Sequence, residues 1–158
     1  MTRHLAHRGA RRRLLTGIAA ALALPALPAR AATTAIEVWK SPTCGCCKDW
    51  ITHLEQAGFA VTVHDVGNTA ARRRLGLPER YGSCHTATVA GYVVEGHVPA
   101  ADVRRLLERR PQALGLAVPG MPVGSPGMDG AVYGGRRDPY DVLLVRRDGS
   151  SEVFTPYR

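Results

Sequence analysis

The sequence contains 158 residues, 45% of them hydrophobic and 22% charged, which suits one ordinary domain with a single core. Its formal net charge of +8 would by itself favour a nucleic-acid partner. The distribution of charge excludes that interpretation, because six of the 21 basic residues and none of the 13 acidic ones lie in positions 1–31. The remainder has 15 basic against 13 acidic residues, so we expect no nucleic acid among its partners.

The first 31 residues have the features of an export signal. An arginine-rich segment at 1–13 precedes an apolar stretch at 14–27, which is too short for a stable membrane span. Ala29-Arg30-Ala31 fits a signal-peptidase site, so cleavage is predicted near Ala31 and Ala32, with a mature domain over 32–158. Arg11-Arg12-Arg13-Leu14-Leu15 resembles a twin-arginine signal, and an ordinary arginine-rich secretion signal is the alternative. Both predict a periplasmic protein.

The mature chain predicts an α/β fold. Alternating apolar residues indicate a strand at 36–39, and the spacing of Trp50, Ile51 and Leu54 indicates a helix over 46–57, capped by Gly58. A strand over 59–65 completes a βαβ unit. Further along, the pattern predicts a short helix at 68–75, a third strand at 88–94, a helix at 99–109, a Gly/Pro-rich loop at 118–135, and a β-hairpin of strands at 140–146 and 152–157.

Four cysteines are the most informative feature. Cys44, Cys46 and Cys47 lie within four residues, and Cys84 stands apart beside His85. Three interpretations are open: two disulfides, thiol exchange at the C-x-x-C of Cys44 and Cys47, or a metal site. Two bridges would be crowded, because adjacent cysteines pair only under severe strain. A helix N-terminus lowers the pKa of a thiol, which serves exchange and metal binding alike.

The chemistry of sulfur narrows the choice of metal. Soft thiolates select Cu(I) or Zn(II). A C-x-C-C triplet matches the paired knuckles of structural zinc poorly, whereas crowded sulfurs that bridge several ions suit Cu(I). We therefore predict a thiolate site for copper, as Cu(I) and with the possibility of a multinuclear cluster, with zinc less favoured. Its predicted ligands are Cys44, Cys46, Cys47 and Cys84.

Other side chains are weaker candidates. His85 can act as a ligand or tune the neighbouring sulfur, and being an ordinary loop residue is the alternative. Met121 and Met128 can offer thioethers to Cu(I), although loop methionines usually pack. For His97, which follows Gly96 in a turn, a structural hydrogen bond is expected. The sequence contains no evident Ser/His/Asp arrangement, phosphate loop or carboxylate pair, so no catalytic residue is predicted.

Several segments, in order along the chain, resemble the exported copper-resistance proteins of the CopG type, also described as the DUF411 family of predicted metal-binding proteins. The resemblance implies a thioredoxin-like fold, an envelope location, and copper bound by the four cysteines; partners would be copper ions and other envelope copper-handling proteins. The segments are Cys44-Gly45-Cys46-Cys47-Lys48, Ser83-Cys84-His85-Thr86, Tyr92-Val93-Val94-Glu95-Gly96-His97-Val98-Pro99, Val118-Pro119-Gly120-Met121-Pro122, and Gly124-Ser125-Pro126-Gly127-Met128.

Two features favour metal binding over thiol exchange. Thioredoxins and glutaredoxins place a cis-proline against their C-x-x-C, usually after a pair such as Thr-Val, but Thr88-Val89 is followed here by Ala90. In addition, Cys46 puts an extra sulfur inside the C-x-x-C. The sequence therefore favours a protein that holds Cu(I) outside the cytoplasm and contributes to copper resistance. The alternative is a thiol-disulfide or copper oxidoreductase.

Overall fold

The computed structural model describes residues 33–158, so the predicted export signal lies outside the described residues. Three α-helices and two short 3₁₀ turns accompany the strands: α1 (Gly45–Gln56), α2 (Thr69–Arg74), α3 (Ala100–Arg109), η1 (Glu79–Tyr81) and η2 (Ala131–Tyr133). The strands are β1 (Ala35–Lys40), β2 (Ala60–His64), β3 (His85–Val89), β4 (Tyr92–Glu95), β5 (Gly115–Ala117), β6 (Tyr140–Val145) and β7 (Ser151–Tyr157).

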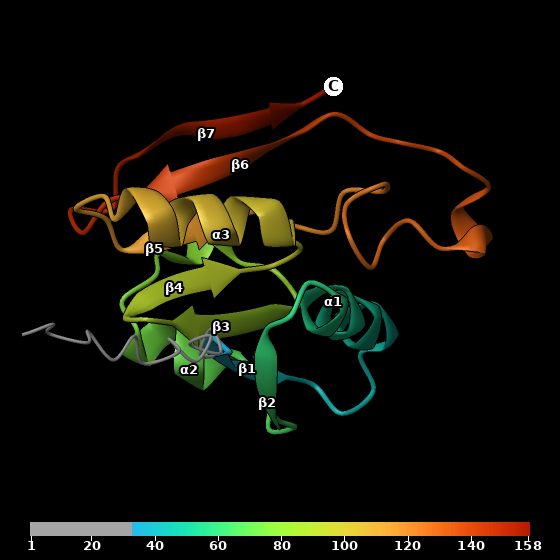
Figure 1. The fold of residues 1–158 in the computed structure, drawn as a ribbon, viewed down its shortest axis with the longest axis horizontal. Coiled ribbons are helices and arrows are strands. Elements are labelled where there is room, and N and C mark those ends of the chain that lie inside the picture. The colour runs from blue at the N-terminus through green and yellow to red at the C-terminus, as the bar shows by residue number, and fades with distance from the viewer. Residues whose placement is uncertain (1–32) are drawn as a thin grey trace, which may run out of the picture. The chain divides into compact units, whose positions relative to one another are not determined.

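All of these strands join one mixed sheet in the order β2-β1-β3-β4-β5-β6-β7 (Figure 1). The pairs β1–β2 and β4–β5 are parallel, and the other neighbours are antiparallel. Both parallel pairs have a helix in their connection, α1 in the first and α3 in the second, as parallel neighbours require. The mixed α/β class predicted from the sequence is confirmed.

Successive strand residues point to opposite faces of the sheet, and each face has its own hydrophobic cluster. Val94 and Leu116 belong to the larger cluster, which also contains buried apolar side chains of α1 and α3. Their neighbours Val93 and Ala117 belong to a smaller cluster that includes Tyr81 of η1. The helix that follows the cysteine loop is therefore held on the same face as α3.

Helix α1 begins directly after Cys44, and its buried residues hold it against the sheet. Cys47, Trp50, Ile51 and Leu54 are its buried residues, and their spacing places them on one helical face. The helix ends where Gly58 adopts a φ of +86°, a conformation that favours glycine. The predicted helix, its cap and the parallel β1–β2 pair are all confirmed.

The prediction of a single third strand at 88–94 is wrong. The segment forms two antiparallel strands, β3 and β4, joined by Ala90 and Gly91. Both joining residues have positive φ, 46° and 85°, which gives a two-residue hairpin turn. Ala-Gly is a weak hairpin signal because alanine seldom adopts positive φ. The turn is therefore set by strand pairing rather than by local preference.

The short strand β5 has no counterpart in the sequence prediction. A Cβ atom at Gly115 would collide with the carbonyl group of Val93 on the neighbouring strand. Glycine thus permits the close approach of β4 and β5, although it is a poor strand former in isolation. The pairing of β5 with both β4 and β6 connects the C-terminal β6–β7 pair to the rest of the sheet.

Helix α3 receives its N-terminal cap from another helix. Its N-cap residue, Pro99, makes no side-chain cap. Instead, the backbone N–H of Ala100 donates to Nε2 of His53 on α1 at 3.0 Å. His53 must be neutral at this nitrogen to accept the bond, and burial lowers its pKa. The two helices on this face are therefore linked through one imidazole.

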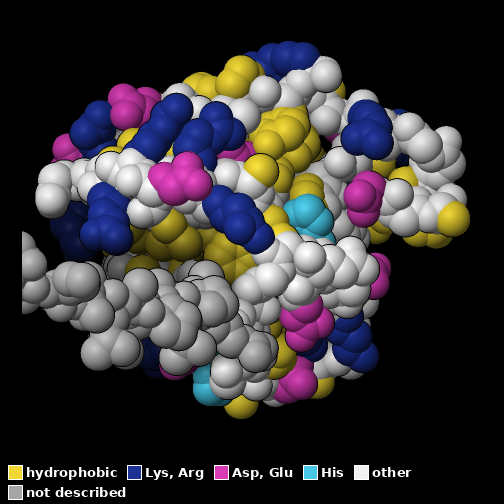
Figure 2. Space-filling model, in the orientation of Figure 1, with side chains coloured by type: hydrophobic (Ala, Val, Ile, Leu, Met, Phe, Trp, Pro, Cys, Tyr) yellow, Lys and Arg dark blue, Asp and Glu magenta, His cyan; other side chains and the backbone are white. Residues whose placement is uncertain are grey.

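Charged side chains of both signs cover the face that carries α3, as Figure 2 shows. Arg104 lies over the ring of Phe59, and Arg105 and Arg109 lie over Phe154. These arginines pack along aromatic rings instead of projecting as one basic patch. Among residues 33–158, no helix has both the length and the apolar character needed to cross a membrane.

Candidate metal centre

The sheet brings the two cysteine-bearing segments together. Strands β1 and β3 are antiparallel neighbours, and Lys40 at the end of β1 pairs with His85 at the start of β3. The chain leaves β1 into the Cys44–Cys47 segment at the same edge where Cys84 enters β3. As a result, the four sulfur atoms all lie within 4.8 Å of one another.

The four cysteines differ in oxidation state. Cys44 and Cys47 form a disulfide, whereas Cys46 and Cys84 are free and partly exposed. The Cys46 Sγ lies 3.6 Å from the Cys44 Sγ and 3.9 Å from the Cys84 Sγ. In this state the site offers two thiols, and reduction of the disulfide by two electrons would provide the other two sulfurs as thiolates.

Two buried histidines lie on the other side of Cys84. The Cys84 Sγ is 3.4 Å from Nδ1 of His85 and 3.2 Å from Nε2 of His97, and these three residues form a second group of possible ligands. The remaining ring nitrogens face backbone carbonyls: His85 Nε2 lies 2.9 Å from the Gly96 oxygen, and His97 Nδ1 lies 2.8 Å from the Pro126 oxygen. A carbonyl oxygen can only accept a hydrogen bond, so the ring nitrogens that face these carbonyls carry the protons. The sulfur is thus faced by two imidazole lone pairs.

Two imidazole nitrogens face Cys84 as hydrogen-bond acceptors, but the thiol has only one proton to donate. The Cys84 thiol can donate its single hydrogen to His85 or to His97, but not to both. A metal ion bound by the sulfur and both nitrogens would satisfy all three groups. Ligand histidines commonly donate their second N–H to a backbone carbonyl, as both rings do here. The donor set suits a thiophilic ion such as copper or zinc.

Burial keeps these groups uncharged when no ion is bound. Burial and the neighbouring Cys46 raise the pKa of Cys84 to about 12. Burial, with a smaller contribution from His97, lowers the pKa of His85 to about 3, and burial also lowers the pKa of His97. A bound cation would have to displace the Cys84 proton, as is general for thiolate ligands.

The tryptophan of α1 fixes the His85 ring. Trp50 is fully buried, and its ring centroid lies 4.1 Å from that of His85. Its indole N–H donates to the Val98 carbonyl at 2.9 Å, so the large side chain has a single orientation. His85 is therefore not an ordinary loop residue but a fully buried part of β3.

The two methionines of the Gly/Pro-rich loop have different environments. Met128 is buried, and its sulfur accepts a hydrogen bond from the Tyr133 hydroxyl at 3.3 Å. Met121 is 51% exposed. It follows Gly120, whose N–H donates to the Gly82 carbonyl and whose own carbonyl accepts a hydrogen bond from the Ser83 hydroxyl. The loop is thus joined to the chain just before Cys84.

The expectation drawn from Ala90 needs correction. Ala90 lies at the end of β3 remote from the cysteines, so its identity says nothing about the position facing the C-x-x-C. That position, just before β3, is occupied by Cys84 itself, and residues 33–158 contain no cis peptide bond.

His97 does make the expected structural bond, to Pro126, but it also faces Cys84. Its separation of 13 residues from Cys84 becomes an informative signal only once the hairpin between them is known.

Comparisons with known proteins agree on one family. A family model described as "Protein of unknown function, DUF411" matches residues 81–128. A solved structure named "Copper resistance protein copG- Form 2" is 50% identical, covers 80% of this chain and 99% of its own, and has a TM-score of 0.74. "Copper resistance protein copG- Form 1" is 51% identical, covers 79% and 98%, and has a TM-score of 0.73. No curated protein matches the chain.

Proposed function

Because this chain belongs to the family of CopG-type copper-resistance proteins, we propose that it binds copper at its cysteine cluster and thereby limits free copper. The observation that carries this proposal is the convergence of sulfur and nitrogen donors on Cys84. In the reduced protein the four cysteines hold Cu(I) as thiolates, and their closeness suits sulfurs shared between several ions. His85 and His97 supply nitrogen ligands through the lone pairs that face Cys84.

The rest of the proposal concerns fold and location. The strand order β2-β1-β3-β4, with α1 between the parallel strands, supports a thioredoxin-like core extended by β5, β6 and β7. The N-terminal sequence supports export by the twin-arginine route to the periplasm, where the mature protein exchanges copper with other envelope proteins. Zinc is the less favoured ion, because the C-x-C-C spacing does not provide two separate pairs of cysteines.

A second function is favoured by one observation. The Cys44–Cys47 disulfide spans a C-x-x-C at the beginning of a helix, which is the arrangement used in thiol-disulfide exchange. In an exchanger, one of these sulfurs attacks the substrate and the other resolves the mixed disulfide. Cys46 and Cys84 would then be dispensable. Copper oxidoreductase activity is a further form of this alternative, in which the bound metal changes valence.

Replacing Cys84 distinguishes the two functions. We expect Cys84→Ser to reduce Cu(I) affinity at least tenfold in competition with a chelator, because a hydroxyl is a much harder ligand than a thiolate. Native mass spectrometry of the reduced protein should show fewer bound copper ions in this variant. Unchanged copper binding in Cys84→Ser, with turnover of a test disulfide that is lost only in Cys44→Ser and Cys47→Ser, would refute the four-cysteine copper site and support the exchanger.

A further inference from the structure

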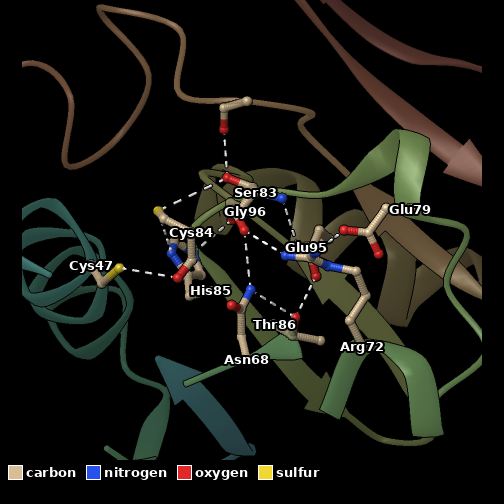
Figure 3. A network of polar contacts seen from close by, with 11 residues as sticks. Cys47, Asn68, Arg72, Glu79, Ser83, Cys84, His85, Thr86, Glu95 and Gly96 are labelled. Atoms are coloured by element: carbon tan, nitrogen blue, oxygen red, sulfur yellow. Dashed lines mark hydrogen bonds and ion pairs between the residues drawn. The ribbon is translucent and has the colours of Figure 1, made fainter. Parts of the chain in front are cut away.

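A network of buried polar side chains lies directly behind Cys84 (Figure 3). Arg72 of α2 and Glu95 at the end of β4 form an ion pair, with Arg72 Nε 2.9 Å from Glu95 Oε1. Both side chains also bind Ser83, the residue before Cys84. The Ser83 N–H donates to Glu95 Oε1 at 2.7 Å, and the Ser83 carbonyl accepts from Arg72 Nη2 at 2.6 Å. Each backbone polar group of Ser83 is thus held by a charged side chain.

A second pair of side chains extends the network to the other side of Cys84. Asn68 Nδ2 donates to the same Ser83 carbonyl at 3.0 Å and to the Thr86 hydroxyl at 3.3 Å. Thr86 in turn donates to Glu95 Oε2 at 2.6 Å. The residues immediately before and after the Cys84-His85 pair are therefore tied to one another through Glu95. Neither end of this short segment can shift without breaking several bonds.

Close packing leaves little room for that segment to move. A Cβ atom at Gly82 would lie 2.8 Å from Arg72 Nη1. At Gly96, where φ is +70°, a Cβ atom would lie 2.6 Å from the Ser83 Cβ and would collide with the Val118 carbonyl. Gly82 therefore leaves room for the Arg72 guanidinium, and Gly96 lets the end of β4 lie directly against Ser83.

The energetics of this ion pair argue against a role in stability alone. Glu95 is fully buried and Arg72 is 6% exposed, so both charges lose most of their hydration. Replacing such a pair with apolar side chains of similar size is often neutral or stabilising. What apolar residues cannot reproduce here is the hold on Ser83. The directional bonds of Arg72 and Glu95 distinguish this pair from simple packing.

We propose that Arg72 and Glu95 are positioning residues that hold Cys84 where its sulfur meets both the cysteine loop and the two histidines. This inference rests on the proposed copper site and deepens it. The Cys84 Sγ lies 3.9 Å from the Cys46 Sγ and 3.2 Å from His97 Nε2, so a shift of about 1 Å would break one set of contacts to improve the other.

The test replaces the pair and compares it with another buried pair. In Arg72→Met/Glu95→Leu both charges are removed together, so no buried charge is left without its partner. The matched control is Arg105→Met/Asp102→Leu, which removes an ion pair whose carboxylate is also fully buried and accepts from Thr155 and Tyr157. We expect Cu(I) affinity to fall about 10–100-fold in the first variant and to stay within about threefold in the control.

Each variant is compared under conditions where circular dichroism shows it to be folded. Glu95→Gln serves where the double variant does not fold, because it keeps the size of the side chain and removes its charge. We expect Glu95→Gln to weaken Cu(I) binding as the double variant does. Wild-type affinity and copper stoichiometry in the folded variants would overturn the positioning role.

A readout without copper separates this inference from the proposed function. Dibromobimane alkylates two neighbouring thiols and releases two bromide ions and two protons, so it joins Cys46 to Cys84 while Cys44 and Cys47 remain a disulfide. We expect the rate of linkage to fall about tenfold when Arg72 and Glu95 are replaced. If the wild-type protein binds no copper and the linkage rate still falls when Arg72 and Glu95 are replaced, the proposed function is refuted and the positioning role is supported. An unchanged linkage rate would refute the positioning role.

Discussion

Replacing His97 with alanine tests whether the imidazole serves the metal or only the fold. The change removes Nε2, which lies 3.2 Å from the Cys84 Sγ, and the Nδ1–H that donates to the Pro126 carbonyl. The ring is fully buried, so the variant loses packing and leaves that carbonyl without its partner. We expect the free energy of unfolding to fall by about 2–4 kcal/mol. Loss of a nitrogen ligand should also weaken Cu(I) binding about 10–100-fold, or about 1.4–2.7 kcal/mol.

The assay is competition for Cu(I) with a chelator in reduced protein, at a temperature where chemical denaturation shows the variant to be folded. His53→Ala is the matched control, because His53 also accepts a hydrogen bond as a neutral imidazole but caps α3 instead of facing Cys84. It should destabilise the fold by about 0.5–2 kcal/mol without changing copper affinity. A His97→Ala variant that is destabilised but binds Cu(I) within threefold of wild type would refute ligation and leave His97 with its bond to Pro126 alone.

Three further outcomes are expected. Gly115→Ala should destabilise the protein by more than about 3 kcal/mol in denaturant titration, because its Cβ collides with the neighbouring strand, whereas Gly130→Ala, with open space around it, should change stability by less than about 1 kcal/mol. Thiol titration under denaturing conditions should count two thiols before reduction and four after it, since Cys44 and Cys47 are paired; four at the outset would contradict the disulfide. Burial lowers the pKa of His53, so the unfolded chain binds more protons below about pH 6.5 and the stability from this group declines as pH falls through that value. The destabilisation by His53→Ala should therefore be larger at pH 7.5 than at pH 5.5, and equal values would contradict the neutral cap.

Local patterns were enough to predict the start of the fold. The spacing of Trp50 and Leu54 and the glycine at position 58 determine where α1 lies and ends, and these signals are contained within a few residues. The gathering of Cys84 with the other cysteines was also predictable in outline. That prediction rested on the preference of soft metal ions for several thiolates. In the structure, the antiparallel pairing of β1 with β3 brings the cysteines together.

The features that sequence reasoning missed depend on contacts between distant segments. The turn at Ala90 and the strand at Gly115 have weak local preferences and exist because neighbouring strands impose them. His97 could not be recognised as facing Cys84 until the hairpin between them was known. Ala90 was misplaced for a different reason, because it was located from the preceding Thr88-Val89 pair, which lies at the end of β3 remote from the cysteines.

The contact between Trp50 and His85 gives the protein its own optical probe. A fully buried indole, whose ring centre is 4.1 Å from that of a proposed ligand, would lose emission when copper binds, because quenching by a metal depends on close approach. The other tryptophan, Trp39, stacks instead on His64 of β2. Replacing Trp39 with phenylalanine would therefore leave a protein whose fluorescence comes from one indole at the centre, and copper entry and release could be followed in real time without any label.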